Sequence, residues 1–546
     1  MHEQVRPDDV APHRSVLAKL GWINNMPYWG VSALIHMIVM LVLINIVWQV
    51  EEAAERDTQV VISVRPLKSD KAPAPYRPQD ERDIVENPHR LPTPTHDEEV
   101  QSLPLIDIEE PVTDDPWGTD ERNKTNISIA LLNPDGTNST IGIGGGPVAE
   151  QGTPIGVGDR ERSDGPPRTS SAIRAALEWL RRHQHPDGHW SAHDYTELCD
   201  KTLGPCKSDP KLNAFTDGRG DSNYDVGVTA LAMLAYLGTG HTHRDGRYPE
   251  YVDVMRRALD WMLKQQQRSS DPQSNGVYGR IGACEDWVYN HAIATMAMAE
   301  LLMLSRDRVN LRNSVQAATE YVLGAQNPGS GWRYKYRGGA SDSSVTGWMV
   351  LALKAAKICA DSRLINVEAD TFRQSFAGAM SWFDRVTSQA NGKAGYQAPG
   401  DSGSQLNNTY PEPYPFSKNL SCMTAVSVLC RLFSGEKRSS EAVKRGIELL
   451  TKSPPTWRPH EPKRPSSINI YYWYYASYAM FQYGGPAWDT WNEAMLAALV
   501  PTQRVLGEED GSWDPVDEWS AIGGRVYTTA LGAMTLQVYD RYLRAK

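Results

Sequence analysis

The chain has 546 residues and a formal net charge of −10, from 56 Lys and Arg against 66 Asp and Glu. This acidic balance disfavours nucleic acid as a partner, because phosphate backbones bind surfaces rich in Lys and Arg. Six cysteines are few for this length, so we expect no disulfide framework. Aromatic residues gather in the last two thirds of the chain, which predicts one large globular domain behind an extended segment.

An apolar run at residues 28–50 contains no Asp, Glu, Lys or Arg and follows a polar stretch, residues 1–27. The run is long enough for a transmembrane helix, which needs ~20 residues. Tyr28, Trp29 and Trp48 lie at its ends, where interfacial anchors are expected. Basic residues before the run favour a cytoplasmic N-terminus. We therefore expect a single-pass protein of the cytoplasmic membrane that contacts the lipid bilayer here and holds its C-terminal domain in the periplasm.

A histidine, His36, lies inside this run, and Ser32 precedes it by four residues, so both share one face of the predicted helix. An ionisable side chain at that depth is costly and is a candidate for function. Ser-x-x-x-His in an anchor followed by a Pro-rich linker resembles the TonB family, whose C-terminal domain has no counterpart in this sequence. The resemblance implies that Ser32 and His36 face a proton-channel-type partner in the membrane. The alternative is a histidine that packs on a helix neighbour or is simply tolerated.

The next segment, residues 51–170, is rich first in Pro and acidic residues and then, at 141–158, in Gly. Pro stiffens a chain toward polyproline II, like charges extend it, and Gly makes it flexible. We expect a disordered linker that separates the globular domain from the membrane.

Residues 171–546 repeat one pattern six times: an amphipathic outer helix, a turn and a more apolar inner helix. The expected outer helices are Ser171–Gln184, Tyr251–Gln267, Arg312–Gln326, Asp370–Gln389, Glu441–Lys452 and Trp488–Gln503. The expected inner helices are Asp225–Tyr236, Trp287–Leu304, Asp342–Ile358, Asn419–Phe433, Ser467–Tyr483 and Arg525–Leu543. Such repeats predict a solenoid or a closed ring, and six pairs without a polar capping copy favour closure. The predicted fold is all-α, an (α/α)6 toroid.

A Gln-x-x-x-Gly-x-Trp motif joins the first pair, at Gln184, Gly188 and Trp190, and looser forms recur at 326–332 and 503–513. The motif resembles the QW repeat of squalene and hopene cyclases, whose toroid is shared with prenyltransferase β subunits and complement-like thioester domains. We expect the glutamine to satisfy carbonyls at the outer-helix end and the glycine to permit a turn with positive φ. The tryptophan is expected to lie across the next helix start and tie the copies together.

The candidate site residues follow from this ring, because its cavity lies on the axis where the inner helices begin. Asp342 and Asp225 are the candidate catalytic acids, although an Asp before Ser is also an ordinary N-cap. The expected cavity-lining residues are Tyr289, His291, Trp348, Tyr471, Trp473 and Tyr527. Aromatic rings stabilise carbocations by cation–π contact, but they also fill the core of a helical ring.

We expect no metal and no other cofactor. Zinc-ligand side chains at the second inner helix have spacings that match no standard site: Cys284, Asp286 and His291. We interpret four histidines around the first turn as part of a solvated loop: His183, His185, His189 and His193. Cys199 and Cys206 could close a small disulfide in an oxidising compartment, and the sequence leaves this open.

The functional prediction rests on what the ring lacks. Cyclases of the resembling family protonate an alkene with an Asp of an Asp-x-Asp-Asp motif, which residues 171–546 do not contain. We therefore expect a non-catalytic module that binds an apolar small molecule or a protein outside the membrane and is coupled to the TonB-type partner. The alternative is an isoprenoid cyclase or prenyltransferase-like enzyme with a non-standard catalytic acid.

Overall fold

The computed structural model describes residues 167–200, 202–206, 217–268, 278–282, 288–402, 409–410, 412–418 and 420–541. All described residues belong to one compact unit. The expected transmembrane helix at 28–50, with Ser32 and His36, and nearly all of the linker lie outside the described residues. None of the described helices has the length and hydropathy of a membrane span.

Twelve helices form the framework of the described part. The outer helices are α3 (Pro167–Arg182), α5 (Pro249–Lys264), α7 (Arg312–Ala325), α9 (Ala369–Val386), α11 (Glu441–Thr451) and α13 (Gly485–Leu499). The inner helices are α4 (Asp225–Gly238), α6 (Val288–Ser305), α8 (Ser343–Asp361), α10 (Cys422–Phe433), α12 (Ile470–Tyr483) and α14 (Ser520–Leu536). Five shorter elements are η4 (Asp194–Leu198), η5 (Ser222–Tyr224), η6 (Val500–Thr502), η7 (Gly507–Glu509) and α15 (Val538–Arg541).

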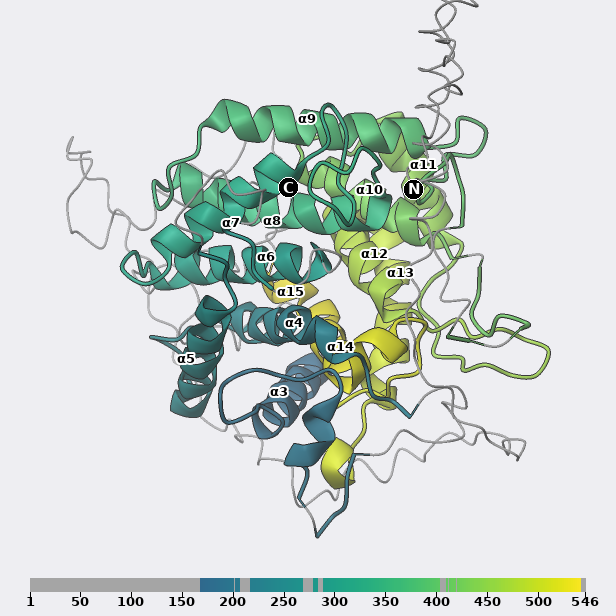
Figure 1. Ribbon diagram of the computed structural model, residues 1–546. Coiled ribbons are helices and arrows are strands. Elements are labelled where there is room, and N and C mark those ends of the chain that lie inside the picture. Colours follow the sequence, from purple (N-terminus) through teal and green to yellow (C-terminus); the bar gives the residue numbers. More distant parts are fainter. Residues whose placement is uncertain are drawn as a thin grey trace, which may run out of the picture. The chain divides into compact units, whose positions relative to one another are not determined.

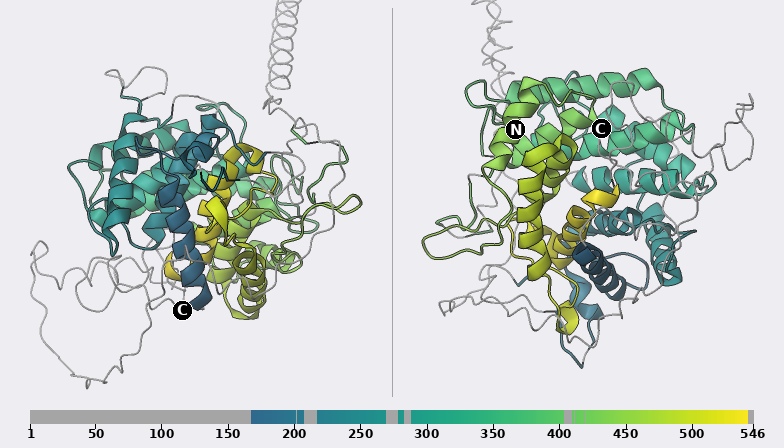
Figure 2. Two further views of the ribbon diagram at one scale, coloured as in Figure 1. Left: turned by 90° about the horizontal axis from the view of Figure 1, so that it is seen from below. Right: turned by 180° about the vertical axis from the view of Figure 1, so that it is seen from behind.

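The inner helices close a ring. Each packs against the next from α4 to α14, and α14 packs back against α4 (Figures 1 and 2). The outer helices surround them, and α7 and α11 each contact the two inner helices beside them. This confirms the predicted all-α toroid of helix pairs.

Burial explains why one class of helix is amphipathic and the other is apolar. On α5, Val254, Met255 and Ala258 are buried, while Asp253 and Arg256 on the opposite face are exposed. On the inner helix α4 every residue after the first is buried, because outer helices cover one side and neighbouring inner helices the others. An inner helix therefore needs apolar or small residues all round.

Glutamines at four corners link successive outer helices. The side-chain amides of Gln184, Gln266, Gln326 and Gln503 each donate to two carbonyl oxygens. One acceptor belongs to the corner itself and the other to the next outer helix; the pairs are Gly188 and Val254, Gly279 and Ser314, Ser330 and Ser375, and Gly511 and Ala172. Their role is thus wider than the expected satisfaction of open carbonyls at the outer-helix end.

The corner tryptophans act within one copy instead. The indole Nε1 of Trp190, Trp332 and Trp513 donates to a carbonyl oxygen near the end of the preceding outer helix, on Leu180, Val322 and Leu499. Their backbone N–H groups donate to a threonine hydroxyl of the following inner helix. The hydrogen bonds of the tryptophans therefore stay within one copy, and it is the glutamine whose hydrogen bonds link neighbouring copies.

The last inner helix also differs from the prediction, which was one helix over 525–543. Gly524 has φ 62° and ψ −163°, which kinks α14, and a second break at Gln537 starts the short helix α15. Arg541 on α15 forms a buried ion pair with Glu300 of α6, at 2.7 Å, and donates to the carbonyl oxygen of Leu234 on α4. Figure 1 shows α15 among the inner helices. It therefore covers the end of the ring where α4 finishes.

Candidate functional site where the inner helices begin

The opposite end of the ring gathers polar and aromatic side chains from several inner helices. The hydroxyl groups of Ser344 on α8 and Tyr471 on α12 are 2.9 Å apart. Tyr527 on α14 donates to Asp517 at 3.3 Å, and the Tyr471 ring lies 6.5 Å from that of Trp519. We call this region the hub. It brings together residues from both halves of the domain.

Asp342 is the buried acid of the hub. It is the N-cap of α8, and its Oδ1 accepts a hydrogen bond from the Val345 N–H at 2.8 Å. Among the described residues no hydrogen bond of good geometry reaches Oδ2, and Arg333 Nε lies 3.9 Å away. The carboxyl group is 0 % exposed, and this burial raises its pKa to about 7, although the Val345 N–H and the Arg333 guanidinium act in the opposite direction. Asp342 therefore caps a helix and is also an acid that keeps its proton near neutral pH.

Tyrosines surround this acid. The Tyr334 and Tyr396 hydroxyls are hydrogen-bonded at 2.6 Å, and the Tyr289 ring lies 6.3 Å from that of Tyr334. Burial raises the pKa of Tyr289, Tyr396 and Tyr471 well above the ordinary value, and the nearby Asp342 carboxyl adds to this. These phenols stay neutral, so Asp342 lies among aromatic rings with Arg333 as a nearby cation.

Two further buried acids, Asp517 and Glu518, precede α14. The Asp517 carboxylate accepts from Ser520 Oγ at 2.6 Å and from the Ile470 N–H at 3.0 Å. Glu518 Oε1 accepts from the Tyr414 hydroxyl at 2.5 Å. Burial raises the pKa of Asp517 to about 6 and that of Glu518 to about 7. The sequence interpretation missed this pair, although an Asp-Glu step at the start of the last inner helix was a signal for it.

Asp225, the other candidate acid, contacts the first corner. Its Oδ1 accepts from the Ala192 N–H at 2.8 Å, and Oδ2 lies 3.8 Å from His189 Nε2. Burial raises the pKa of Asp225 to about 6. Asp225 is therefore part of the first corner, and none of these contacts joins it to Asp342.

The residues expected to line the cavity divide into two groups. The first group belongs to the hub and consists of Tyr289, Tyr471 and Tyr527. Trp348 packs next to them, and its ring centroid lies 5.8 Å from that of Tyr474. His291 instead joins α6 to α7: its Nδ1 accepts from the Ile281 N–H at 3.0 Å, and Nε2 faces the Ala318 carbonyl oxygen at 3.2 Å. Burial lowers the pKa of His291 to about 3. Trp473 packs near the outer helices against Trp457, with centroids 6.0 Å apart.

The four histidines around the first turn also have different surroundings. His185 stacks on His189, which stacks on Trp261, whereas His193 contacts the adjacent Asp194. Only His183 points inward, and it is fully buried. Cys284, Glu285 and Asp286, whose spacing suggested no standard zinc site, lie outside the described residues.

A pocket of about 450 Å³ lies on a different part of the domain, lined by His243, Arg244, Arg256, Leu259, Asp260, Leu263, Asp307 and Asn310. Asp307 forms an ion pair with Arg244 and a hydrogen bond with the His243 imidazole, both at 2.9 Å. Although burial by itself raises the pKa of Asp307, hydrogen bonds from Asn310 and His243 lower it to about 2. This acid is ionised and fully paired, which suits a structural junction better than proton donation.

The family model of the squalene-hopene cyclase C-terminal domain matches residues 159–367, a range that includes Asp342. The match supports a cyclase-like α/α toroid. A comparison with curated proteins finds no significant match.

Solved structures with a similar fold include type II terpene cyclase MstE from Scytonema. An MstE variant in complex with geranylgeranyl dihydroxybenzoate has 13 % identity and a TM-score of 0.40, over 68 % of this chain and 97 % of that one. A protein from Actinoplanes has 15 % identity and a TM-score of 0.36, over 68 % and 99 %. These likenesses are weak, and the functional argument below rests on the residues of this chain.

Proposed function

We propose that the ring is an acid-catalysed cyclase of apolar, polyunsaturated isoprenoid molecules, with Asp342 as the proton donor. The observation that carries the proposal is a fully buried carboxylic acid, with its pKa raised to about 7, among neutral tyrosines. An acid that donates a proton at neutral pH needs a pKa near the working pH, and burial supplies this shift. The family match over residues 159–367 supports the same class of reaction.

The proposed step moves one proton from Asp342 Oδ2 to a carbon of a substrate double bond. The substrate becomes a carbocation, and Asp342 becomes a carboxylate whose charge is stabilised by Arg333, 3.9 Å away. A second double bond attacks the cation and closes a ring. The cyclised cation then loses a proton to water, and Asp342 regains a proton from solvent before the next turnover. Cyclisation of this kind leaves the composition of the substrate unchanged and requires no oxidant.

The aromatic side chains of the hub suit the cationic intermediate. The Tyr289 and Tyr471 side chains lie near the acid, and Trp348 packs against Tyr471 with ring centroids 6.4 Å apart. A cation within about 6 Å of an aromatic ring face gains roughly 0.5–2 kcal/mol, more when water is excluded. Tyr289 is partly accessible, yet burial raises its pKa well above the ordinary value. We expect partial exposure together with a raised pKa for a side chain that lines a recess.

Asp342 is a better donor than the second pair of acids. Both oxygens of Asp517 accept hydrogen bonds, and Glu518 is bonded to Tyr414. Hydrogen bonds from donors favour the carboxylate form, so they oppose the burial that raises the pKa of these two acids to about 6 and about 7. We assign Asp517 and Glu518 to positioning Tyr527 and Tyr414 at the rim of the site.

The test is incubation of the purified full-length chain, in detergent, with squalene and with prenyl diphosphates of increasing length. We expect cyclised hydrocarbon from at least one of them, and a loss of at least about 10²-fold in Asp342→Asn. Asp225→Asn is the matched control, because it removes a half-buried acid of similar pKa at another place, and it should retain turnover. Turnover that is equal in wild type and Asp342→Asn would contradict the assignment.

A second proposal is a ring that binds the same class of ligand without converting it, coupled to a membrane partner through the anchor. The observation that favours it is that residues 171–546 contain no Asp-x-Asp-Asp motif; Asp342 is followed by Ser343, Ser344 and Val345, none of which is an acid. Saturable binding of squalene without any product, unchanged in Asp342→Asn, would favour this function over the first.

A further inference from the structure

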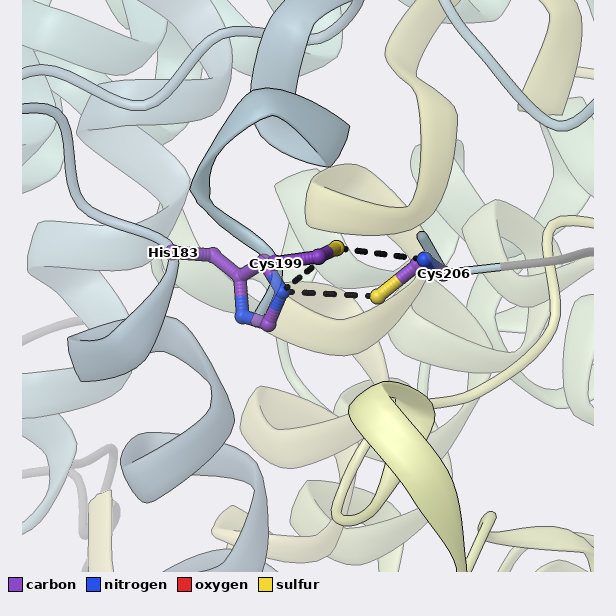
Figure 3. Close-up of side chains that lie close together, drawn as sticks. All are labelled: His183, Cys199 and Cys206. Atoms are coloured by element: carbon purple, nitrogen blue, oxygen red, sulfur yellow. Dashed lines mark hydrogen bonds between the residues drawn. The ribbon is translucent and has the colours of Figure 1, made fainter. Parts of the chain in front are cut away.

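Three potential metal ligands meet at the first corner of the ring (Figure 3). His183 follows the last turn of α3, Cys199 follows η4, and Cys206 follows a turn in which the N–H groups of Leu203 and Gly204 donate to the Asp200 carbonyl oxygen. The imidazole nitrogen and the two sulfur atoms all lie within 4.8 Å of one another. Both cysteines are free thiols.

The spacing of the three atoms fits a tetrahedral zinc ion. His183 Nε2 lies 3.5 Å from Cys199 Sγ and 3.4 Å from Cys206 Sγ. Zinc bonds of about 2.3 Å to sulfur and 2.0–2.1 Å to nitrogen, at a tetrahedral angle, place two such ligands roughly 3.5 Å apart. The two nitrogen–sulfur separations are therefore those that zinc requires, and the two sulfur atoms lie within 4.8 Å of each other.

The imidazole is oriented as a ligand. His183 Nδ1 lies 2.9 Å from the Trp179 carbonyl oxygen, and a carbonyl only accepts, so Nδ1 carries the proton. The lone pair of Nε2 consequently faces the two sulfur atoms. Trp179 also stacks on the imidazole, with centroids 4.2 Å apart, and fixes its plane. A backbone carbonyl that holds the second nitrogen is the usual support of a metal-binding histidine.

Hydrogen bonding and charge at the sulfur atoms also favour a bound zinc ion. The Cys206 N–H donates to Cys199 Sγ at 3.1 Å, a contact that stabilises a thiolate. His183 is 0 % exposed, and both cysteines are buried. Two thiolates and one Zn²⁺ have no net charge, which makes their burial far less costly than that of either charge alone.

We propose that His183 Nε2, Cys199 Sγ and Cys206 Sγ bind one zinc ion. Among the described residues no fourth His, Cys, Asp or Glu joins this group, and a water molecule can take the fourth position. Binding forms two Zn–S bonds and one Zn–N bond and releases the two thiol protons, without oxidation or reduction. The ion ties the segment 194–206 to the end of α3, and this role is independent of proton donation by Asp342.

The test is metal analysis of the full-length chain purified under reducing conditions. We expect about one zinc per chain, and a fall in zinc affinity of about tenfold or more in Cys206→Ser. Cys359→Ser is the matched control, because Cys359 is a buried thiol of α8 that donates to the Ala299 carbonyl oxygen, as a serine can. Equal zinc content in wild type and Cys206→Ser would overturn the proposal.

Cobalt substitution gives a second readout that does not depend on activity. Co²⁺ added to the metal-free chain should produce a thiolate charge-transfer band and the visible bands of a tetrahedral site, which Cys206→Ser lacks. Zinc should also raise the thermal midpoint of wild type and leave that of Cys206→Ser unchanged. A reduced chain that takes up neither metal, and forms a Cys199–Cys206 disulfide in air, would overturn the site in favour of a redox pair.

Discussion

The side-chain amide of Gln503, at the end of the last outer helix, donates to the carbonyl oxygen of Ala172 on the first, at 2.8 Å. The two residues are 331 positions apart in the chain. The same amide donates to Gly511 at 2.7 Å, so one side chain satisfies its own corner and closes the ring. Gln184 makes the equivalent pair of bonds between the first and second outer helices.

Replacing Gln503 with Ala should lower the thermal midpoint of the domain. Two buried carbonyl oxygens lose their donor, and each unsatisfied group costs about 1–3 kcal/mol. Gln316→Ala is the control, because its amide donates to Glu320 and to the Asn366 carbonyl oxygen at an exposed position. Calorimetry of both variants is the measurement, and an equal midpoint for the two would contradict a closing role for Gln503.

Gly188 has φ +107°, and an added Cβ would lie 2.1 Å from the carbonyl oxygen of Arg257 on α5. Gly435 has a similar φ of +93° but no atom within 4 Å of such a Cβ. We expect Gly435→Ala to cost about 1 kcal/mol from backbone strain alone. Gly188→Ala should cost about 1–3 kcal/mol more, because the corner and the next helix must separate. Urea unfolding of the two variants measures this difference, and equal losses would argue against tight corner packing.

The buried Asp342 also predicts how stability depends on pH. Its pKa is raised from 3.8 to about 7 in the folded chain, so between these values the native state holds a proton that the unfolded state has lost. The contribution of this group is fully present below pH 4 and is lost as the pH rises toward 7. Asn can also cap α8, so Asp342→Asn should fold and should lose less stability than wild type over this range. Identical pH profiles of unfolding for the two proteins would mean that the acid is not shifted.

The helix pairs were predictable from sequence because each has its own local signal. The apolar face of α5, the small-residue run of α4 and the Gly-Trp step before α8 fixed both the number and the order of the elements. Closure was predictable from the count of six pairs. The kink in α14 was not predictable. It depends on the close approach of Gly524 to the Ala192 carbonyl oxygen, which would lie 2.3 Å from a Cβ atom added at Gly524.

The site was harder to predict because its residues come from distant copies. Asp342 was found from its place at an inner-helix start, but its shift in pKa depends on burial that no local pattern reveals. His183 belonged to a cluster interpreted as a solvated loop, and only the structure shows that it turns toward Cys199 and Cys206. Asp517 and Glu518 were not predicted, because their surroundings depend on Ile470 and Tyr414, which are distant from them in the sequence.

The membrane anchor at residues 28–50 and its TonB-like motif stay predictions. If Ser32 and His36 contact a proton-channel partner, His36→Ala in the full-length chain should abolish co-purification of that partner while the chain stays in the membrane fraction. Ile35→Ala is a control at the adjacent position, on another helix face. Equal co-purification from both variants would contradict the proposed contact.

The most direct test of the account is the origin of the proton that starts the reaction. The full-length chain is incubated in D₂O with whichever isoprenoid substrate it converts, and the product is analysed by mass spectrometry. We predict one deuterium per cyclised molecule, at the carbon protonated by Asp342, and no labelled product from Asp342→Asn. A cyclised product without deuterium, or labelled product from Asp342→Asn at the wild-type rate, would contradict Asp342 as the proton donor.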